Sequence, residues 1–159
     1  MGMEFEKCQM PSFSVIGKEG STEDGEGFIK QLWEEANGNF REIEHLALKD
    51  ESGVLLGIWG LMSDSTRSYR PWEDNFTKGL YLAGAQVTED AICPSGWVKW
   101  TVPSYEYVYG KVIGDSREAF VRGLEYIKES GLSLVGAAFD YFCPEENGQL
   151  YFFYPVRRL

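Results

Sequence analysis

The stretch YEYVYGKVIGDSRE, residues 105–118, decides the fold. Its first six residues alternate tyrosine with other side chains. Because a strand displays alternate residues on opposite faces, we expect a strand over 105–112. Asp115, followed three positions later by Glu118, predicts the capped start of a helix. The helix is expected to end at Gly131, after an apolar stripe formed by Phe120, Leu124 and Ile127.

Two more strands are expected after this helix, over 134–142 and 150–156, with a turn at 144–148 between them. The same β-α-β-β order is predicted earlier in the chain. Its elements are a strand at 13–17, a helix over 28–43 that is divided near Gly38, and strands over 54–62 and 80–87.

Weak internal similarity indicates a duplication, because residues 56–59 correspond to 135–138 and residues 79–82 to 148–151. We therefore expect one α+β domain over 1–159, with half-modules at about 12–90 and 96–159. Neither βαββ unit can bury a sheet face alone, so the units should pair about a pseudo-two-fold axis. Antiparallel sheets paired in this way leave a central groove, and such junctions are preferred ligand sites.

Composition narrows the classes of function. The 159 residues carry a net charge of −10, which argues against direct DNA or other nucleic-acid binding. The same charge raises the local concentration of cationic small molecules. The 10 Phe, 9 Tyr and 5 Trp residues make up 15% of the chain, more ring area than one small core usually needs. We expect some of these rings to line a cavity.

Further classes of protein are excluded by the cysteine and histidine content and by the sequence at the chain ends. Three scattered cysteines favour a reducing, cytoplasmic setting, and one histidine (His45) without a C-x-x-C pair provides no zinc ligand set. The sequence predicts no metal and no cofactor. It shows neither a signal peptide nor an apolar run of about 20 residues, so no membrane association is expected.

Two short segments carry a resemblance to a known family. They are WTVPSYEY at 100–107 and YPVRR at 154–158, set within the two βαββ units. Together they resemble the GyrI-like superfamily, small-molecule-binding domains also found as effector-binding domains of MerR- and AraC-type multidrug-responsive regulators. The resemblance covers essentially the whole chain. It implies a stand-alone domain whose aromatic groove takes bulky, lipophilic, often cationic compounds.

The sequence departs from the family at one position. The family's last strand often carries a Glu four residues before its Pro, where it meets the positive charge of the ligand. Here that position is Tyr151, so the acid must come from elsewhere. The sequence also leaves no room for a helix-turn-helix before Phe13, so we expect no direct DNA binding by this chain.

Two acids are candidates for this role. Glu106 stands between two tyrosines, where it could meet a cation or act as a base on water; the alternative is that it points to solvent. Asp140 is the related candidate in the later strand, with turn capping or exposure as its alternative.

Aromatic residues on the predicted strands are candidates for the groove walls, because ring faces attract cations. The alternative for each is core packing. The candidates are Trp59, Trp100, Tyr105, Tyr107, Tyr151 and Phe153.

The connection over 63–78 is rich in rings. It could form a lid with Tyr69 and Trp72 reaching inward, or Trp72 and Phe76 could only hold the loop on the sheet. The acidic run from Glu19 to Glu26 predicts a solvated loop.

Two functions from different classes follow. The first is binding or sequestration of amphiphilic, cationic small molecules. The second, implied by the resemblance, is hydrolysis of cyclopropane-bearing natural products, with Glu106 activating water and Tyr105 or Tyr107 donating a proton. Some family members bind a topoisomerase, so a protein partner is a third possibility that the sequence does not test.

Overall fold

The computed structural model describes residues 4–159, apart from the side chains of residues 75 and 76. The strands are β1 (Phe5–Met10), β2 (Phe13–Ser21), β3 (Ile58–Ser63), β4 (Leu80–Val87), β5 (Val98–Val102), β6 (Tyr105–Lys111), β7 (Phe139–Cys143) and β8 (Gln149–Arg158). The helices are α1 (Phe28–Gly38), the short α2 (Glu73–Phe76) and α3 (Ser116–Glu129).

The strands form one antiparallel sheet in the order β1-β6-β8-β7-β3-β4-β2-β5. Strands β3 and β7 meet at its centre and pair over only three positions, from Ile58 with Phe142 to Gly60 with Asp140. The order is the same when the sheet is read inward from either edge. Each edge has one added strand, β1 or β5, and the first, third and second strands of a βαββ unit follow it. This confirms the α+β class, and the repeated order is what a duplication would produce.

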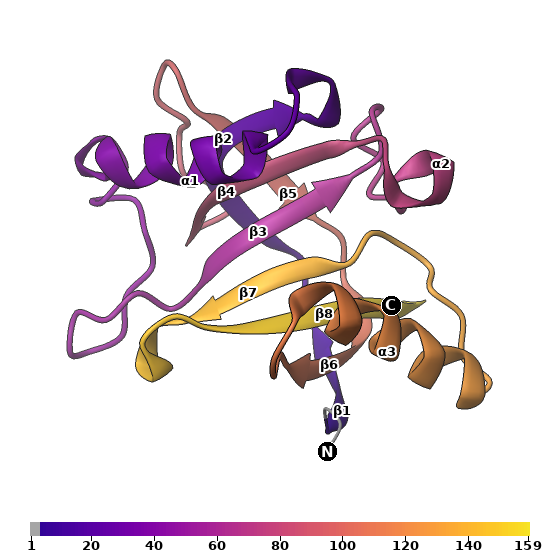
Figure 1. The fold of residues 1–159 in the computed structure, drawn as a ribbon. Helices are drawn as coiled ribbons and strands as arrows, with labels where there is room; N and C mark the ends of the chain where they lie inside the picture. Colours follow the sequence, from indigo (N-terminus) through magenta and orange to yellow (C-terminus); the bar gives the residue numbers. More distant parts are fainter. Residues whose placement is uncertain (1–3) are drawn as a thin grey trace.

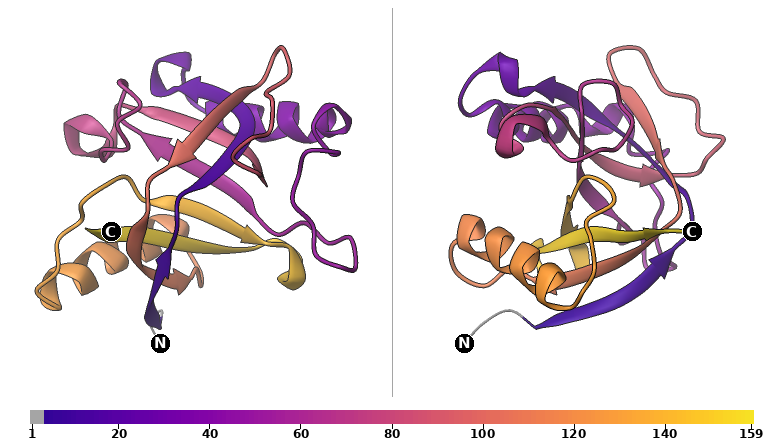
Figure 2. Two further views of the ribbon diagram at one scale, coloured as in Figure 1. Left: turned by 180° about the vertical axis from the view of Figure 1, so that it is seen from behind. Right: turned by 90° about the vertical axis from the view of Figure 1, so that its right-hand side faces the viewer.

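Both long helices lie on the same side of the sheet (Figures 1 and 2). Helix α1 packs its buried Phe28, Leu32 and Ala36 on β2 and β4. Helix α3 packs on β6 and β8, where a Cβ at Gly123 would overlap the hydroxyl of Tyr154. This close approach explains why α3 has a glycine at position 123.

Local signals in the sequence explain where the helices begin and end. The Asp115 side chain accepts hydrogen bonds from the backbone N–H groups of Arg117 (2.9 Å) and Glu118 (3.0 Å), which confirms it as the N-cap of α3. The left-handed φ of Gly131, +75°, ends that helix. The division predicted near Gly38 is also confirmed, because α1 ends there and a 3-10 turn follows at Phe40–Glu42.

Three strand predictions need correction. Strand β1 is absent from the sequence analysis, and it pairs with β6 as an edge strand. Strands β3 and β7 begin at Ile58 and Phe139, four or five residues later than predicted. Strand β5 pairs with β2 and so extends the sheet of the first half, although residues 96–102 were expected in the second.

Among the described residues, none of the helices is long and apolar enough to cross a membrane.

Candidate functional site

A groove of about 740 Å³ lies between α1 and α3, above the centre of the sheet. Its walls are mostly apolar, and its polar side chains are Ser116, Arg117 and Asp140. The apolar lining residues are Ile29, Met62, Pro71, Trp72, Phe120, Val121, Leu124, Ala137, Ala138, Leu150 and Phe152. The groove therefore draws on both halves of the chain, as the paired-unit interpretation predicts.

Helix α3 forms one wall because of how it is packed. Its small residues Ala119 and Gly123 face the sheet, which leaves the neighbouring Phe120 and Leu124 at the groove. Ala137 and Ala138 line the groove just before β7. Their short side chains add little bulk to the lining, next to Phe120 and Phe152, whose rings contact each other edge-to-face with centroids 5.7 Å apart.

The connection between β3 and β4 forms the opposite rim. Trp72 lines the groove, and its indole N–H donates a hydrogen bond to the carbonyl of Leu80 (2.9 Å). The ring therefore both holds the loop and faces the groove, so elements of both predicted alternatives are present. Phe76, the other ring proposed to hold the loop, lies outside the described side chains.

Asp64 organises the start of this loop. Its buried carboxylate accepts hydrogen bonds from Ser63 Oγ, Thr66 Oγ1 and the Ser68 N–H. Burial alone would raise the pKa of Asp64, but these hydrogen bonds outweigh burial and hold the pKa below its usual value. Further along, the Tyr69 carbonyl accepts a hydrogen bond from the Ala137 N–H (2.7 Å), which joins the loop to the second half.

Asp140 is the carboxylate of the groove. It is half-buried, and it accepts a hydrogen bond of 2.8 Å from the hydroxyl of Tyr81. The Tyr81 hydroxyl in turn accepts a hydrogen bond from the Trp33 indole N–H (3.1 Å). Burial raises the pKa of Asp140 to about 6, and the Tyr81 hydrogen bond partly opposes that rise. At neutral pH the groove thus contains a poorly hydrated negative charge that a cation would stabilise.

Most of the predicted ring candidates lie elsewhere. Together with Phe139, which was not a candidate, they form what we call the aromatic cluster on the face of the sheet away from the helices; its other members are Trp59, Trp100, Tyr105, Tyr107 and Phe153. Their rings pack against one another at centroid distances such as 5.2 Å between Trp59 and Phe153 and 5.8 Å between Tyr105 and Tyr107. The cluster is buried, and Tyr107 retains a hydroxyl that has no hydrogen-bond partner.

Glu106 is separated from its tyrosine neighbours. Tyr105 and Tyr107 enter the aromatic cluster, while Glu106 points to the other face and forms an ion pair with Arg157 (3.1 Å). The hydrogen bond from Arg157 holds the pKa of Glu106 below its usual value. Burial raises the pKa of Tyr105. The carboxylate and phenol proposed to act together on a substrate therefore do not share a site in this structure.

Comparison with known proteins supports the fold. No protein-family model and no curated protein matches the sequence. Among solved structures, the Vibrio cholerae integron cassette protein VCH_CASS2 is 18% identical over 98% of each chain, with a TM-score of 0.61. SAV2435, solved bound to tetraphenylphosphonium, is 19% identical over 98% of this chain and 94% of its own, with a TM-score of 0.64. The chain has the GyrI-like fold.

The C-terminal domain of EcmrR is a further structural match, 14% identical over the full length of both chains with a TM-score of 0.66. Tyr151 stands where the family resemblance led us to expect an acid in the last strand. Its hydroxyl donates to Glu146 (2.7 Å), and this hydrogen bond raises the pKa of Tyr151 to about 12. Tyr151 packs against the aromatic cluster and is not among the groove-lining residues, so Asp140 is the acid that the groove contains.

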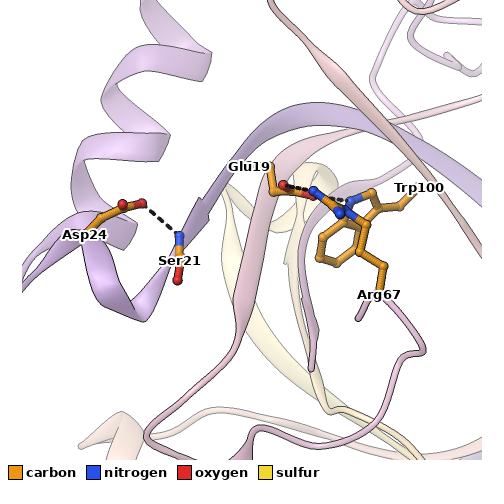
Figure 3. A network of polar contacts seen from close by, with 5 residues as sticks. All are labelled: Glu19, Ser21, Asp24, Arg67 and Trp100. Atoms are coloured by element: carbon orange, nitrogen blue, oxygen red, sulfur yellow. Dashed lines mark hydrogen bonds and ion pairs between the residues drawn. The ribbon is translucent and has the colours of Figure 1, made fainter. Parts of the chain in front are cut away.

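The sequence analysis missed one acid. The prediction of a solvated loop is wrong for Glu19, which lies in β2 with its side chain only 13% exposed. Its carboxylate accepts hydrogen bonds from the Trp100 indole N–H and from Arg67 (Figure 3). The signal was present in the sequence, because Glu19 continues the alternation of Phe13 and Val15, both in the core beneath it.

Proposed function

We propose that this protein binds a lipophilic organic cation in the groove between α1 and α3, with Asp140 supplying the opposite charge. The observation that carries the proposal is a half-buried carboxylate in a groove of about 740 Å³ whose walls are mostly apolar and whose other polar side chains are Ser116 and Arg117. Pockets for drug-sized ligands typically measure about 300–1,000 Å³ and combine apolar walls with a few polar groups.

The physical basis is the cost of an ionised carboxylate in apolar surroundings. A cation without N–H groups can offset that cost by charge alone, while its apolar groups contact Trp72, Phe120 and Phe152. Such contacts tolerate ligands of many shapes, since they need no precise set of hydrogen bonds. The net charge of −10 favours the approach of cations from solution.

The structural matches support the ligand class. SAV2435 was solved with tetraphenylphosphonium, a lipophilic cation, and the EcmrR C-terminal domain shares the fold. A cytoplasmic location and the absence of direct DNA binding stay predictions. We base no second function on Glu106, because it and Tyr105 lie on opposite faces of β6.

The test is calorimetric titration at pH 7.5 with tetraphenylphosphonium and, in parallel, with neutral triphenylphosphine oxide. We expect saturable binding of the cation in the micromolar range and at least tenfold weaker binding of the neutral compound. No cation binding at high micromolar concentration, or equal affinity for both compounds, would overturn the proposal.

A further inference from the structure

Glu19 carries an unusual set of donors for a carboxylate on a mostly apolar sheet face. Arg67 donates to it from Nε (2.8 Å) and Nη2 (2.5 Å), and the Trp100 indole N–H donates at 2.8 Å (Figure 3). The two bonds from Arg67 have the paired geometry in which a planar guanidinium meets a carboxylate. The indole N–H occupies part of the remaining capacity of Glu19 Oε1.

The partners of Glu19 differ in how firmly they are held. Trp100 is buried in β5, and Glu19 itself lies in β2 beside it. Arg67 comes from the loop after β3, and its side chain is 55% exposed. The guanidinium therefore approaches from solvent, and it can leave without disturbing the buried side chains around Glu19.

Two aromatic rings lie near this carboxylate. Tyr69 packs edge-to-face against Trp100, with ring centroids 5.8 Å apart. Burial raises the pKa of Tyr69 to about 12, so its hydroxyl is neutral and adds no competing negative charge. A flat cation bonded to Glu19 would thus lie beside two aromatic side chains.

The turn that carries Arg67 is held independently of the ion pair with Glu19. Arg67 has a left-handed φ of +58°, as Tyr69 does at +59°, and this conformation costs a non-glycine residue about 1 kcal/mol. The turn is held by its own contacts with Asp64, including the bond from the Arg67 N–H to the Asp64 carbonyl (3.1 Å). The loop therefore does not depend on the ion pair alone.

We propose that Glu19 and Trp100 form a second cation site, one that Arg67 occupies as an internal ligand. An external guanidinium or amidinium carrying an aromatic group binds there by exchanging with the Arg67 side chain. This site is distinct from the groove, since none of its residues lines the groove. It selects compounds with paired N–H donors, whereas the groove selects apolar cations.

The probe is benzamidine, whose amidinium presents two parallel N–H groups and whose ring is flat. Binding is followed by calorimetry and by the NMR signal of the Trp100 indole N–H, assigned with Trp100→Phe. We expect Arg67→Ala to bind benzamidine at least tenfold more tightly than the wild type, with a saturable shift of that signal. Adding Glu19→Gln to Arg67→Ala should abolish the binding.

Matched variants keep the test decisive. Arg70→Ala removes an exposed arginine of the same loop and should leave benzamidine affinity at the wild-type value. Arg67→Gln keeps the three-carbon stem of the side chain without its positive charge, and it replaces Arg67→Ala if the alanine variant does not fold. Unchanged affinity in the Arg67 variant, or binding that survives Glu19→Gln, would overturn the proposal.

Tetraphenylphosphonium separates the two sites. It has no N–H donors, so Glu19→Gln should leave its affinity within twofold of the wild type. If benzamidine does not bind at Glu19, the proposal for the groove still stands. If tetraphenylphosphonium does not bind, the benzamidine result is unaffected.

Discussion

The hydroxyl of Tyr81 donates a 2.8 Å hydrogen bond to the carboxylate of Asp140 and so links the two halves of the sheet. Tyr81 belongs to β4 of the first half and Asp140 to β7 of the second. Because Trp33 of α1 donates to the same hydroxyl, a chain of hydrogen bonds runs from the helix to the groove. The orientation of the groove's acid thus depends on the junction between the halves.

Tyr81→Phe should weaken both folding and ligand binding. It leaves Trp33 Nε1 without its acceptor and Asp140 without its donor, so we expect a loss of about 1–3 kcal/mol in the free energy of unfolding. It also removes the hydrogen bond that lowers the pKa of Asp140, so cation affinity at pH 6.5 should fall. Urea denaturation and calorimetry measure the two effects.

Tyr109→Phe is the matched control, since it removes a hydroxyl that donates to the exposed Glu6. We expect it to cost less than about 1 kcal/mol. Equal losses in the two variants would contradict a special role for the Tyr81 hydroxyl.

Gly60→Ala tests the same contact from the backbone. A Cβ at this position would overlap the Tyr81 hydroxyl, so the ring must move away from Asp140. We expect a destabilisation of about 1–3 kcal/mol by chemical denaturation. Gly38→Ala meets no atom within 4 Å and lies at the end of α1, so it should be neutral or stabilising by up to about 1 kcal/mol. The reverse order of stabilities would show that the packing at Gly60 is not tight.

Folding stability should depend on pH through Asp140. Its pKa rises from 3.8 in the unfolded chain to about 6 in the fold, so the folded protein binds this proton more tightly. The resulting stabilisation is complete below pH 3.8 and is lost as the pH rises through 6. Between pH 4 and pH 7, the stability of the wild type relative to Asp140→Asn should fall by about 2 kcal/mol. A constant difference between the two proteins would contradict burial of this carboxyl.

Cation binding should show the opposite pH dependence. The ionised carboxylate attracts the cation, so tetraphenylphosphonium affinity should rise from pH 5 to pH 7 and then level off. Asp140→Asn should flatten this profile. Calorimetric titrations at half-unit steps of pH, in buffers of equal ionic strength, measure this profile. A wild-type profile as flat as that of Asp140→Asn would show that the Asp140 carboxylate does not contribute to cation binding.

The sequence predicts most of the fold because its signals are local. The alternation around Glu106, the cap at Asp115 and the glycine after α3 each act within a few residues. The partners of β1 and β5 depend on long-range pairing instead. Strand β1 precedes the first βαββ unit in the chain but pairs with β6 of the second. Strand β5 precedes the second unit but pairs with β2 of the first, and no local pattern specifies these partners.

The site was harder to predict than the fold. Alternation correctly separates Glu106 from Tyr105 and Tyr107, but it does not say which face of the sheet has an open groove. That depends on the size of the side chains beneath the helices, such as Ala137 and Ala138. Of the ten candidate residues, Trp72 and Asp140 line the groove, while the strand rings fill the opposite face. The role of all ten in ligand binding stays a prediction.

The most direct test compares tetraphenylphosphonium affinity at pH 7.5 in the wild type, Asp140→Asn and Glu34→Gln. Glu34 is an exposed acid of α1 whose substitution removes the same unit of charge without touching the groove. The account predicts at least a tenfold loss, about 1.4 kcal/mol, for Asp140→Asn and less than a twofold change for Glu34→Gln. Wild-type affinity in Asp140→Asn would contradict it.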